Sequence, residues 1–347
     1  MQHAVSCALV LVLVAASPAT GATRSTARGA IGAGISGPTS LRASVYARGL
    51  RHVSALAQDA DGRIWAATST GASNGEDAIY VIDHAGGTPT RVVDDVTSPG
   101  GLVWLDSALY VARANGVERY AGFDGVSFAE HHAVLTLPDG VGLVSGLAYG
   151  PDGRLVIGVS APCDSCTPTS PWSASVVTFR PDGTDARVLV SNVRAAVGFA
   201  FYPGTDDLFA TLNQRDDLGA TTPGDWLALL ADGQSWSFPA CYGQGGSACA
   251  GVPDPVATLD RHAAVSGVAI VTGQLGASVG TGAVVAEWST GKVRLVRLQA
   301  TSTGYDGVPT AFLTGFRHPV PVLVTADGAL LVGDWGSGRV VQVRARS

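Results

Sequence analysis

Charged and amide side chains gather at the two ends of one strand-like hairpin in the middle of the chain. Arg194 stands just ahead of the run VGFAFYP, and the second run, DLFATLN, ends in Asn213 and is followed by Gln214, Arg215, Asp216 and Asp217. A positioned guanidinium can stabilise negative charge that develops on an oxygen during a reaction. Polar loops also serve solubility, so both interpretations stay open at this point.

His262 and two tryptophans occupy comparable places in later segments. His262 lies in DRHAAVSG, just before another apolar run, and an imidazole titrates near neutral pH, as a general base should. Trp288 and Trp335 each end a strand-like run. An aromatic ring at such a place can stack on a sugar or a flat cofactor, or it can fill the interior.

A repeated strand pair supplies the elements that would position these residues. A short apolar strand, a Gly/Asp-rich turn and a second apolar strand recur six times, and the second strands are predicted to open at Ile64, Leu109, Leu155, Leu208, Ala283 and Leu330. The steps are 45 to 53 residues except for one of 75. Blades of four-stranded propellers have a period of roughly 40–50 residues. We therefore predict an all-β fold, a six-bladed β-propeller.

In a propeller the ends of the innermost strands and their loops form a rim where ligands usually bind. The hairpin that carries Arg194 and Asn213 is then blade core, and its polar ends are expected at one rim. The long step contains a loop-rich segment, 219–255, of the kind that builds binding surfaces on repeat proteins.

Composition excludes one class of partner. The chain has 347 residues, 46% of them hydrophobic, and a net charge of −6. Lys292 is the only lysine, and the arginines are scattered. Nucleic-acid binding needs a basic stripe that displaces counterions, so we expect no nucleic-acid partner.

The N-terminus has the pattern of an exported protein. Residues 1–22 contain no Lys, Arg, Asp or Glu, and the apolar run 4–16 is too short to span a bilayer. We predict a signal peptide over 1–22, a disordered Gly/Ser/Ala-rich linker over 23–40 and the propeller over 41–347. The protein is expected to be secreted, without membrane insertion after cleavage; an uncleaved anchor is the alternative.

Four cysteines remain after such a cleavage. Their short separations favour the disulfides Cys163–Cys166 and Cys241–Cys249, although sequence does not fix the connectivity. A zinc site would need a second pair of Cys or His ligands at matching spacing, and a thioredoxin-like motif would need a helix after Cys163. Structural disulfides are the favoured interpretation.

An ordered set of segments resembles the glucose/sorbosone dehydrogenase family and the related pyranose dehydrogenase propellers. The segments include GLAYGPDGRLVIGVSAPCDSC, VRAAVGFAFYPGTDDLFATLNQRDDLG and HPVPVLVTADGALLVGDWGSGRVVQV, and the resemblance covers roughly Leu41 to Arg344. It implies a propeller that holds pyrroloquinoline quinone (PQQ) and calcium at the rim. It also implies hydride transfer from a sugar to the quinone, with a histidine as base; the cofactor then carries the difficult chemistry.

The resemblance assigns roles to individual residues. It implies cofactor binding by Arg194, Asn213, Arg215 and Lys292, and calcium binding by Asp216 and Asp225. The family's arginine is usually followed by Asn-Pro, whereas Ala195 and Ala196 follow Arg194 here.

The catalytic base of the family has no counterpart at its usual place. That histidine lies about eight residues ahead of the GPDG turn, where this chain has Gly142. His131, His132 and His262 are the remaining candidates. Loss of a general base typically slows a reaction by roughly 10²–10⁴-fold.

Two functions are therefore expected. One is a secreted PQQ-dependent dehydrogenase that oxidises a sugar hydroxyl or aldehyde and passes electrons to an acceptor that the sequence does not identify. The other is a non-catalytic propeller that binds a small molecule, a carbohydrate or a protein. A calcium-dependent lactone hydrolase is a third possibility, for which Glu287 is the one plausible glutamate ligand.

Overall fold

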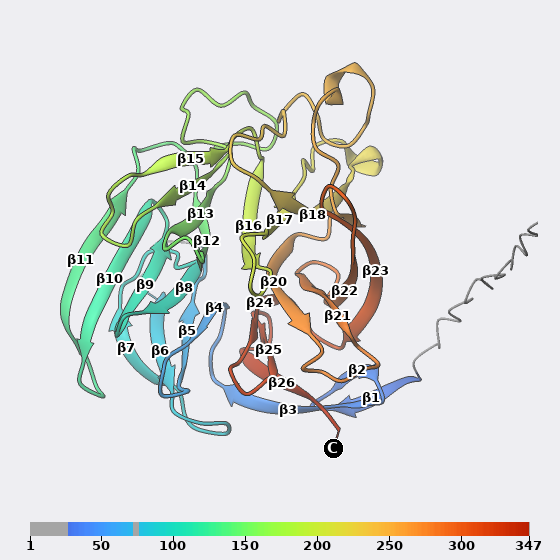
Figure 1. Cartoon of the computed structure of the whole chain (residues 1–347). Coiled ribbons are helices and arrows are strands. Elements are labelled where there is room, and N and C mark those ends of the chain that lie inside the picture. Colours follow the sequence, from blue (N-terminus) through green and yellow to red (C-terminus); the bar gives the residue numbers. More distant parts are fainter. Residues whose placement is uncertain (1–26, 72–75, 347) are drawn as a thin grey trace, which may run out of the picture.

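The computed structural model describes residues 27–71 and 76–346, which form a six-bladed β-propeller (Figure 1). Blade 1 comprises β4 (Val53–Gln58), β5 (Ile64–Thr68), β6 (Ala78–Ile82) and β7 (Thr90–Asp94). Blade 2 comprises β8 (Gly101–Leu105), β9 (Ala108–Arg113), β10 (Gly116–Phe123) and β11 (Phe128–Thr136). Blade 3 comprises β12 (Val144–Tyr149), β13 (Leu155–Val159), β14 (Ser175–Phe179) and β15 (Arg187–Val190).

The second half of the chain completes the ring. Blade 4 comprises β16 (Ala195–Phe201), β17 (Leu208–Asn213), β18 (Gly224–Leu230) and β19 (Ala257–Arg261), with the short 3₁₀ helices η1 (Gly219–Thr221) and η2 (Ser247–Cys249) in its loops. Blade 5 begins with β20 (Val265–Thr272), β21 (Thr281–Glu287), β22 (Lys292–Ala300) and β23 (Tyr305–Thr314). Blade 6 comprises β24 (Pro319–Val324), β25 (Leu330–Asp334), β26 (Arg339–Ala345) and the N-terminal strand β3 (Leu41–Arg48).

The two ends of the chain close the ring. β3 pairs antiparallel with β26 in a register that runs from Arg48↔Arg339 to Leu41↔Ala345. The pairing covers the outer edge of β26, which would otherwise present unpaired backbone groups. It also ties the first blade to the last.

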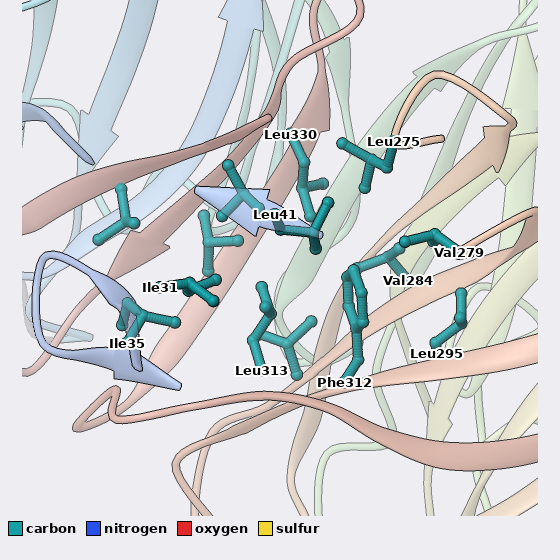
Figure 2. Packing of buried hydrophobic residues seen from close by; sticks show 14 of the residues in the cluster. Ile31, Ile35, Leu41, Leu275, Val279, Val284, Leu295, Phe312, Leu313 and Leu330 are labelled. Carbon is teal, nitrogen blue, oxygen red and sulfur yellow. The ribbon is translucent and has the colours of Figure 1, made fainter. Parts of the chain in front are cut away.

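The predicted disordered linker over 23–40 is wrong where the structure describes it. Residues 28–38 form the hairpin β1 (Arg28–Gly32) and β2 (Ile35–Pro38), which extends blade 5 through the pair Ser36↔Thr314. Ile31 and Ile35 are 3% and 1% exposed. Figure 2 shows them in one cluster with Leu41, Leu313 and Phe312. Burial of these side chains offsets the entropy of ordering the hairpin. The predicted signal peptide, 1–22, lies outside the described residues.

The repeat predicted from sequence matches the blades. β5, β13, β17 and β25 begin at Ile64, Leu155, Leu208 and Leu330 as predicted, and Leu109 and Ala283 lie inside β9 and β21. These second strands are buried on both faces because neighbouring blades pack against them, which explains their continuous apolar runs. No helix in the described part of the chain has the length and apolar character needed to cross a membrane.

The central channel offers no chemistry of its own. A cavity of about 200 Å³ on the axis is lined by glycine, apolar residues and the serines Ser54, Ser69 and Ser145. At Gly198 a Cβ atom would lie 2.3 Å from the carbonyl oxygen of Ser266 in the next blade. Glycine is therefore required for the close approach of inner strands, and candidate chemistry lies at the rim.

Candidate functional site

Four predicted residues lie at one rim of the propeller, on blades 4 and 5. Arg194 immediately precedes β16, Asn213 ends β17, Asp225 is the second residue of β18, and His262 lies between β19 and β20. Adjacent strands are antiparallel, so these starts and ends meet at the same edge of the blade. We call this edge the polar rim, and it includes Arg194, Asn213, Asp225 and His262.

Arg194 is joined to a residue that sequence reasoning did not single out. Its guanidinium forms an ion pair with the carboxylate of Asp164, and its Nε donates to the Asp164 carbonyl oxygen at 3.1 Å. The same carboxylate accepts hydrogen bonds from the backbone N–H groups of Asp216, at 3.0 Å, and Asp217, at 2.8 Å. Asp164 thus links the loop between β13 and β14 to the polar rim.

His262 is the one predicted histidine at the polar rim. Its Nδ1 lies 2.8 Å from Oδ1 of Asp216, and its Nε2 lies 3.3 Å from the carbonyl oxygen of Gly219. The hydrogen bond to Asp216, then that to Gly219, raises the pKa of His262. Both partners are acceptors, so the imidazolium, with two N–H donors, suits the site. The side chain is half exposed and can meet a ligand.

Arg215 is also neutralised by an aspartate. Its Nε and one terminal nitrogen donate to the two carboxylate oxygens of Asp217, each at 2.6 Å. This contact holds the pKa of Asp217 well below its usual range. The guanidinium also lies 5.1 Å from the centre of the Tyr242 ring. The charge of Arg215 is therefore balanced within its own loop.

Asp225 joins two blades. Its Oδ1 accepts from the backbone N–H of Gln214 at 2.8 Å, and its Oδ2 accepts from that of Val265 at 3.2 Å. Asp77 does the same in blade 1. Its carboxylate accepts from the backbone N–H of Thr70, which follows the second strand, and from that of Ser98, which precedes blade 2. Burial raises the pKa of Asp225 to about 6.

The three remaining predicted residues are not part of the network around Arg194, although Lys292 begins its strand at the same end of blade 5. Lys292 begins β22, and its Nζ is 2.9 Å from the carboxylate of Asp260 on β19, the outermost strand of blade 4. His131 and His132 lie on β11, the outermost strand of blade 2. His131 contacts Glu118 at 3.1 Å. Both histidines are held in a paired outer strand, away from the polar rim.

Gly142, where the resemblance would place a histidine, has a backbone conformation that favours glycine. Gly142 has a φ of +114°, and a Cβ atom there would lie 2.0 Å from the carbonyl oxygen of Ser160. No side chain fits this position without rearrangement of the backbone at Ser160, which directly follows β13.

Four aromatic rings from blades 5, 6 and 1 lie at the same rim. Trp288 and Trp335 follow the second strands β21 and β25, and His318 and His52 precede the first strands β24 and β4. The Trp288 and His318 rings stack with centroids 4.2 Å apart, and His52 lies 4.3 Å from Trp335. Trp335 donates from Nε1 to the carbonyl oxygen of Ser69 at 2.9 Å. All four rings are partly exposed. Sequence reasoning found the tryptophans, but nothing in the pattern distinguished His52 and His318 from other loop histidines.

The side chains present do not match a quinone with calcium. Within 27–71 and 76–346, no group of three or more His, Cys, Asp or Glu side chains could hold a metal ion. Both oxygens of Asp225 are occupied by backbone donors. PQQ is a polyanion, yet Arg194 and Arg215 are each paired with an aspartate. At the polar rim, Oδ1 of Asn213 is buried and has no hydrogen-bond partner among the described residues, while Nδ2 donates to the carbonyl oxygen of Val265 at 3.0 Å.

Both predicted disulfides, Cys163–Cys166 and Cys241–Cys249, are present. The first closes the loop that carries Asp164. The second closes part of the long segment between β18 and β19.

Comparisons with known proteins agree on the architecture. Residues 49–70 match the family described as two component regulator propeller. No curated protein is significantly similar to the chain.

Solved structures with the same fold include sugar dehydrogenases. The PQQ-bound aldose sugar dehydrogenase of Streptomyces coelicolor is 21% identical, with a TM-score of 0.69 over 89% of this chain and 99% of that one. The PQQ domain of pyranose dehydrogenase from Coprinopsis cinerea is 15% identical, with a TM-score of 0.71 over 89% and 97%. The apo form of the Escherichia coli soluble aldose sugar dehydrogenase is 16% identical, with a TM-score of 0.71 over 88% and 100%.

Proposed function

We propose that this protein is a secreted propeller of the sugar dehydrogenase type that binds a sugar at its polar rim and lacks the family's base. The observation that carries the proposal is the pairing, on one rim, of a charged hydrogen-bonding network with a partly exposed aromatic group. Arg194, Asp164 and Asp216 offer donors and acceptors, and Trp288 and Trp335 offer flat apolar surfaces. Sugars need both, because each ring carries hydroxyls at its edge and C–H groups on its faces.

The neighbours of the same fold support the sugar as ligand class. They are a PQQ-bound aldose sugar dehydrogenase, the holo PQQ domain of a pyranose dehydrogenase and an apo aldose sugar dehydrogenase. Secretion is supported by the two disulfides, which persist in oxidising compartments.

A second candidate is the active PQQ-dependent dehydrogenase, with the electron acceptor unassigned. The contact between His262 and Asp216 favours it, because a carboxylate that orients an imidazole is a common arrangement for proton transfer. In that role a neutral His262, with Nδ1–H held by Asp216 and Nε2 released from the Gly219 carbonyl, would accept the proton of a sugar hydroxyl, and Arg194 would face the resulting negative charge. Since the neutralised arginines do not match a polyanionic quinone, we assign no step to the cofactor.

One experiment separates the two candidates. The purified protein is mixed with PQQ and calcium, and quinone absorbance, sugar-dependent dye reduction and calorimetric sugar binding are measured. We expect sugar binding that Arg194→Ala weakens and that the outer-strand control His131→Gln leaves unchanged. Dye reduction that is lost in His262→Gln would establish the dehydrogenase instead. If no neutral sugar binds and no dye is reduced, the proposed function is wrong.

A further inference from the structure

A second cavity lies beside the polar rim, on the outer side of blade 4. Its volume is about 560 Å³, within the range of roughly 300–1,000 Å³ typical of small-molecule sites. Residues 221–224 and Trp226, at the start of β18, form one wall. Residues of the segment 241–255, part of which is closed by the disulfide Cys241–Cys249, form another, and β19 completes the cavity. It has no part in the functions assigned above.

The lining combines apolar side chains with one hydroxyl group that has no hydrogen-bond partner among the described residues. Tyr242 contributes a partly exposed ring, and Pro253, Pro255 and the small exposed part of Trp226, 5% of that residue, add apolar surface. Thr222, also in the lining, is 1% exposed, and its Oγ1 has no hydrogen-bond partner within the described residues. A buried hydroxyl without a partner is costly, so a ligand that supplies one is favoured.

The lining of the cavity carries one negative and one positive side chain. Asp254 and Arg261 are its two ionised side chains, and one Arg261 nitrogen is engaged with the carbonyl oxygen of Ala220 at 2.9 Å. A strongly anionic or cationic ligand would leave one of them facing like charge. The site therefore favours a neutral ligand.

The geometry points to a binding site for a neutral saccharide, of monosaccharide to disaccharide size, in this cavity. The saccharide's C–H face meets the ring of Tyr242 and the small exposed part of Trp226, and one of its hydroxyls pairs with Oγ1 of Thr222. This site is separate from the polar rim, although Arg215 contacts Tyr242 and is bonded to Asp217. The inference does not depend on the proposed function.

The test follows the indole N–H signals of the tryptophans by ¹⁵N NMR while cellobiose is added, with Trp226 assigned from Trp226→Phe. We expect the Trp226 signal to shift in the wild type. Thr222→Val keeps the shape of the side chain and should raise the cellobiose concentration needed by about fivefold, the effect of one hydrogen bond. Tyr242→Ala should abolish the shift. The exposed tyrosine Tyr149, at the opposite rim, provides the control Tyr149→Ala.

The outcomes separate the cavity from the rim. Movement of the Trp288 and Trp335 signals alone would overturn the cavity proposal and leave the rim proposal standing. Movement of Trp226 alone would support the cavity and count against the rim. An unshifted Trp226 signal at saturating cellobiose, or identical titrations for wild type and Thr222→Val, would also overturn the proposal. Thermal melts of each variant show whether it is folded.

Discussion

Replacement of Asp225 by asparagine is expected to change how stability depends on pH. Asp225 is 4% exposed, and burial raises its pKa to about 6 from an ordinary value of 3.8. The folded protein therefore binds a proton between these values where the unfolded chain does not. A raised acid pKa stabilises the folded state fully below about 3.8, and this contribution is lost as the pH rises through about 6.

The size of the effect follows from the shift. A pKa difference of one unit between the folded and unfolded states corresponds to about 1.4 kcal/mol. The unfolding free energy at a pH well below 3.8 and at a pH well above 6 therefore differs by about 3 kcal/mol. Between pH 4.5 and 7.5 the wild type should lose about 2 kcal/mol of unfolding free energy relative to Asp225→Asn. The asparagine cannot accept both backbone N–H groups, so the variant also carries a pH-independent penalty of about 1–3 kcal/mol.

Urea denaturation of both proteins across this pH range measures the difference. Asp139→Asn is the control, because Asp139 is exposed and its replacement changes the net charge equally without removing a buried acceptor. Parallel pH curves for wild type and Asp225→Asn would refute the reasoning. They would show that Asp225 is ionised in the folded protein at all these pH values.

Two further predictions concern the rim. Gly142→Ala should lower the unfolding free energy by about 3 kcal/mol, because its Cβ would clash with a carbonyl 2.0 Å away at a φ of +114°. Gly140→Ala, with positive φ but nothing within 4 Å, should cost only about 1 kcal/mol, and equal losses would contradict the clash. Arg194→Ala and Asp164→Ala should show a coupling of about 1 kcal/mol in a double-mutant cycle of urea denaturation, since both side chains are partly buried. Additive effects would mean that the ion pair contributes nothing.

The fold could be predicted because each blade repeats a local signal. A buried second strand is a run of five apolar or small residues next to a Gly/Asp turn, and both features lie within 15 residues of one another. The closure by β3 and the hairpin β1–β2 could not be found this way. Their partners, β26 and β23, lie about 300 residues away in sequence. Ile31 and Ile35, on either side of a glycine-containing turn, were the available signal.

The site was predictable only in part, for a similar reason. Position relative to inner strands placed Arg194, Asn213 and His262 at one rim. Which partners they meet depends on loops of other blades. Asp164 is 30 residues from Arg194 in sequence and sits inside a disulfide loop that looked purely structural.

The pattern of charge at the rim constrains what can bind there. Arg194 and Arg215 each have a carboxylate partner: Asp164, from the loop between β13 and β14, pairs with Arg194, and Asp217 pairs with Arg215. A polyanion would have to displace these aspartates and desolvate them, whereas the hydroxyls of a sugar can bridge an intact ion pair as donor to the carboxylate and acceptor from the guanidinium. Gly142 also leaves no room for a side chain at the position where the resemblance would place the catalytic base. On these electrostatic grounds we expect a neutral polyol, rather than a polyanionic quinone, to bind at this rim.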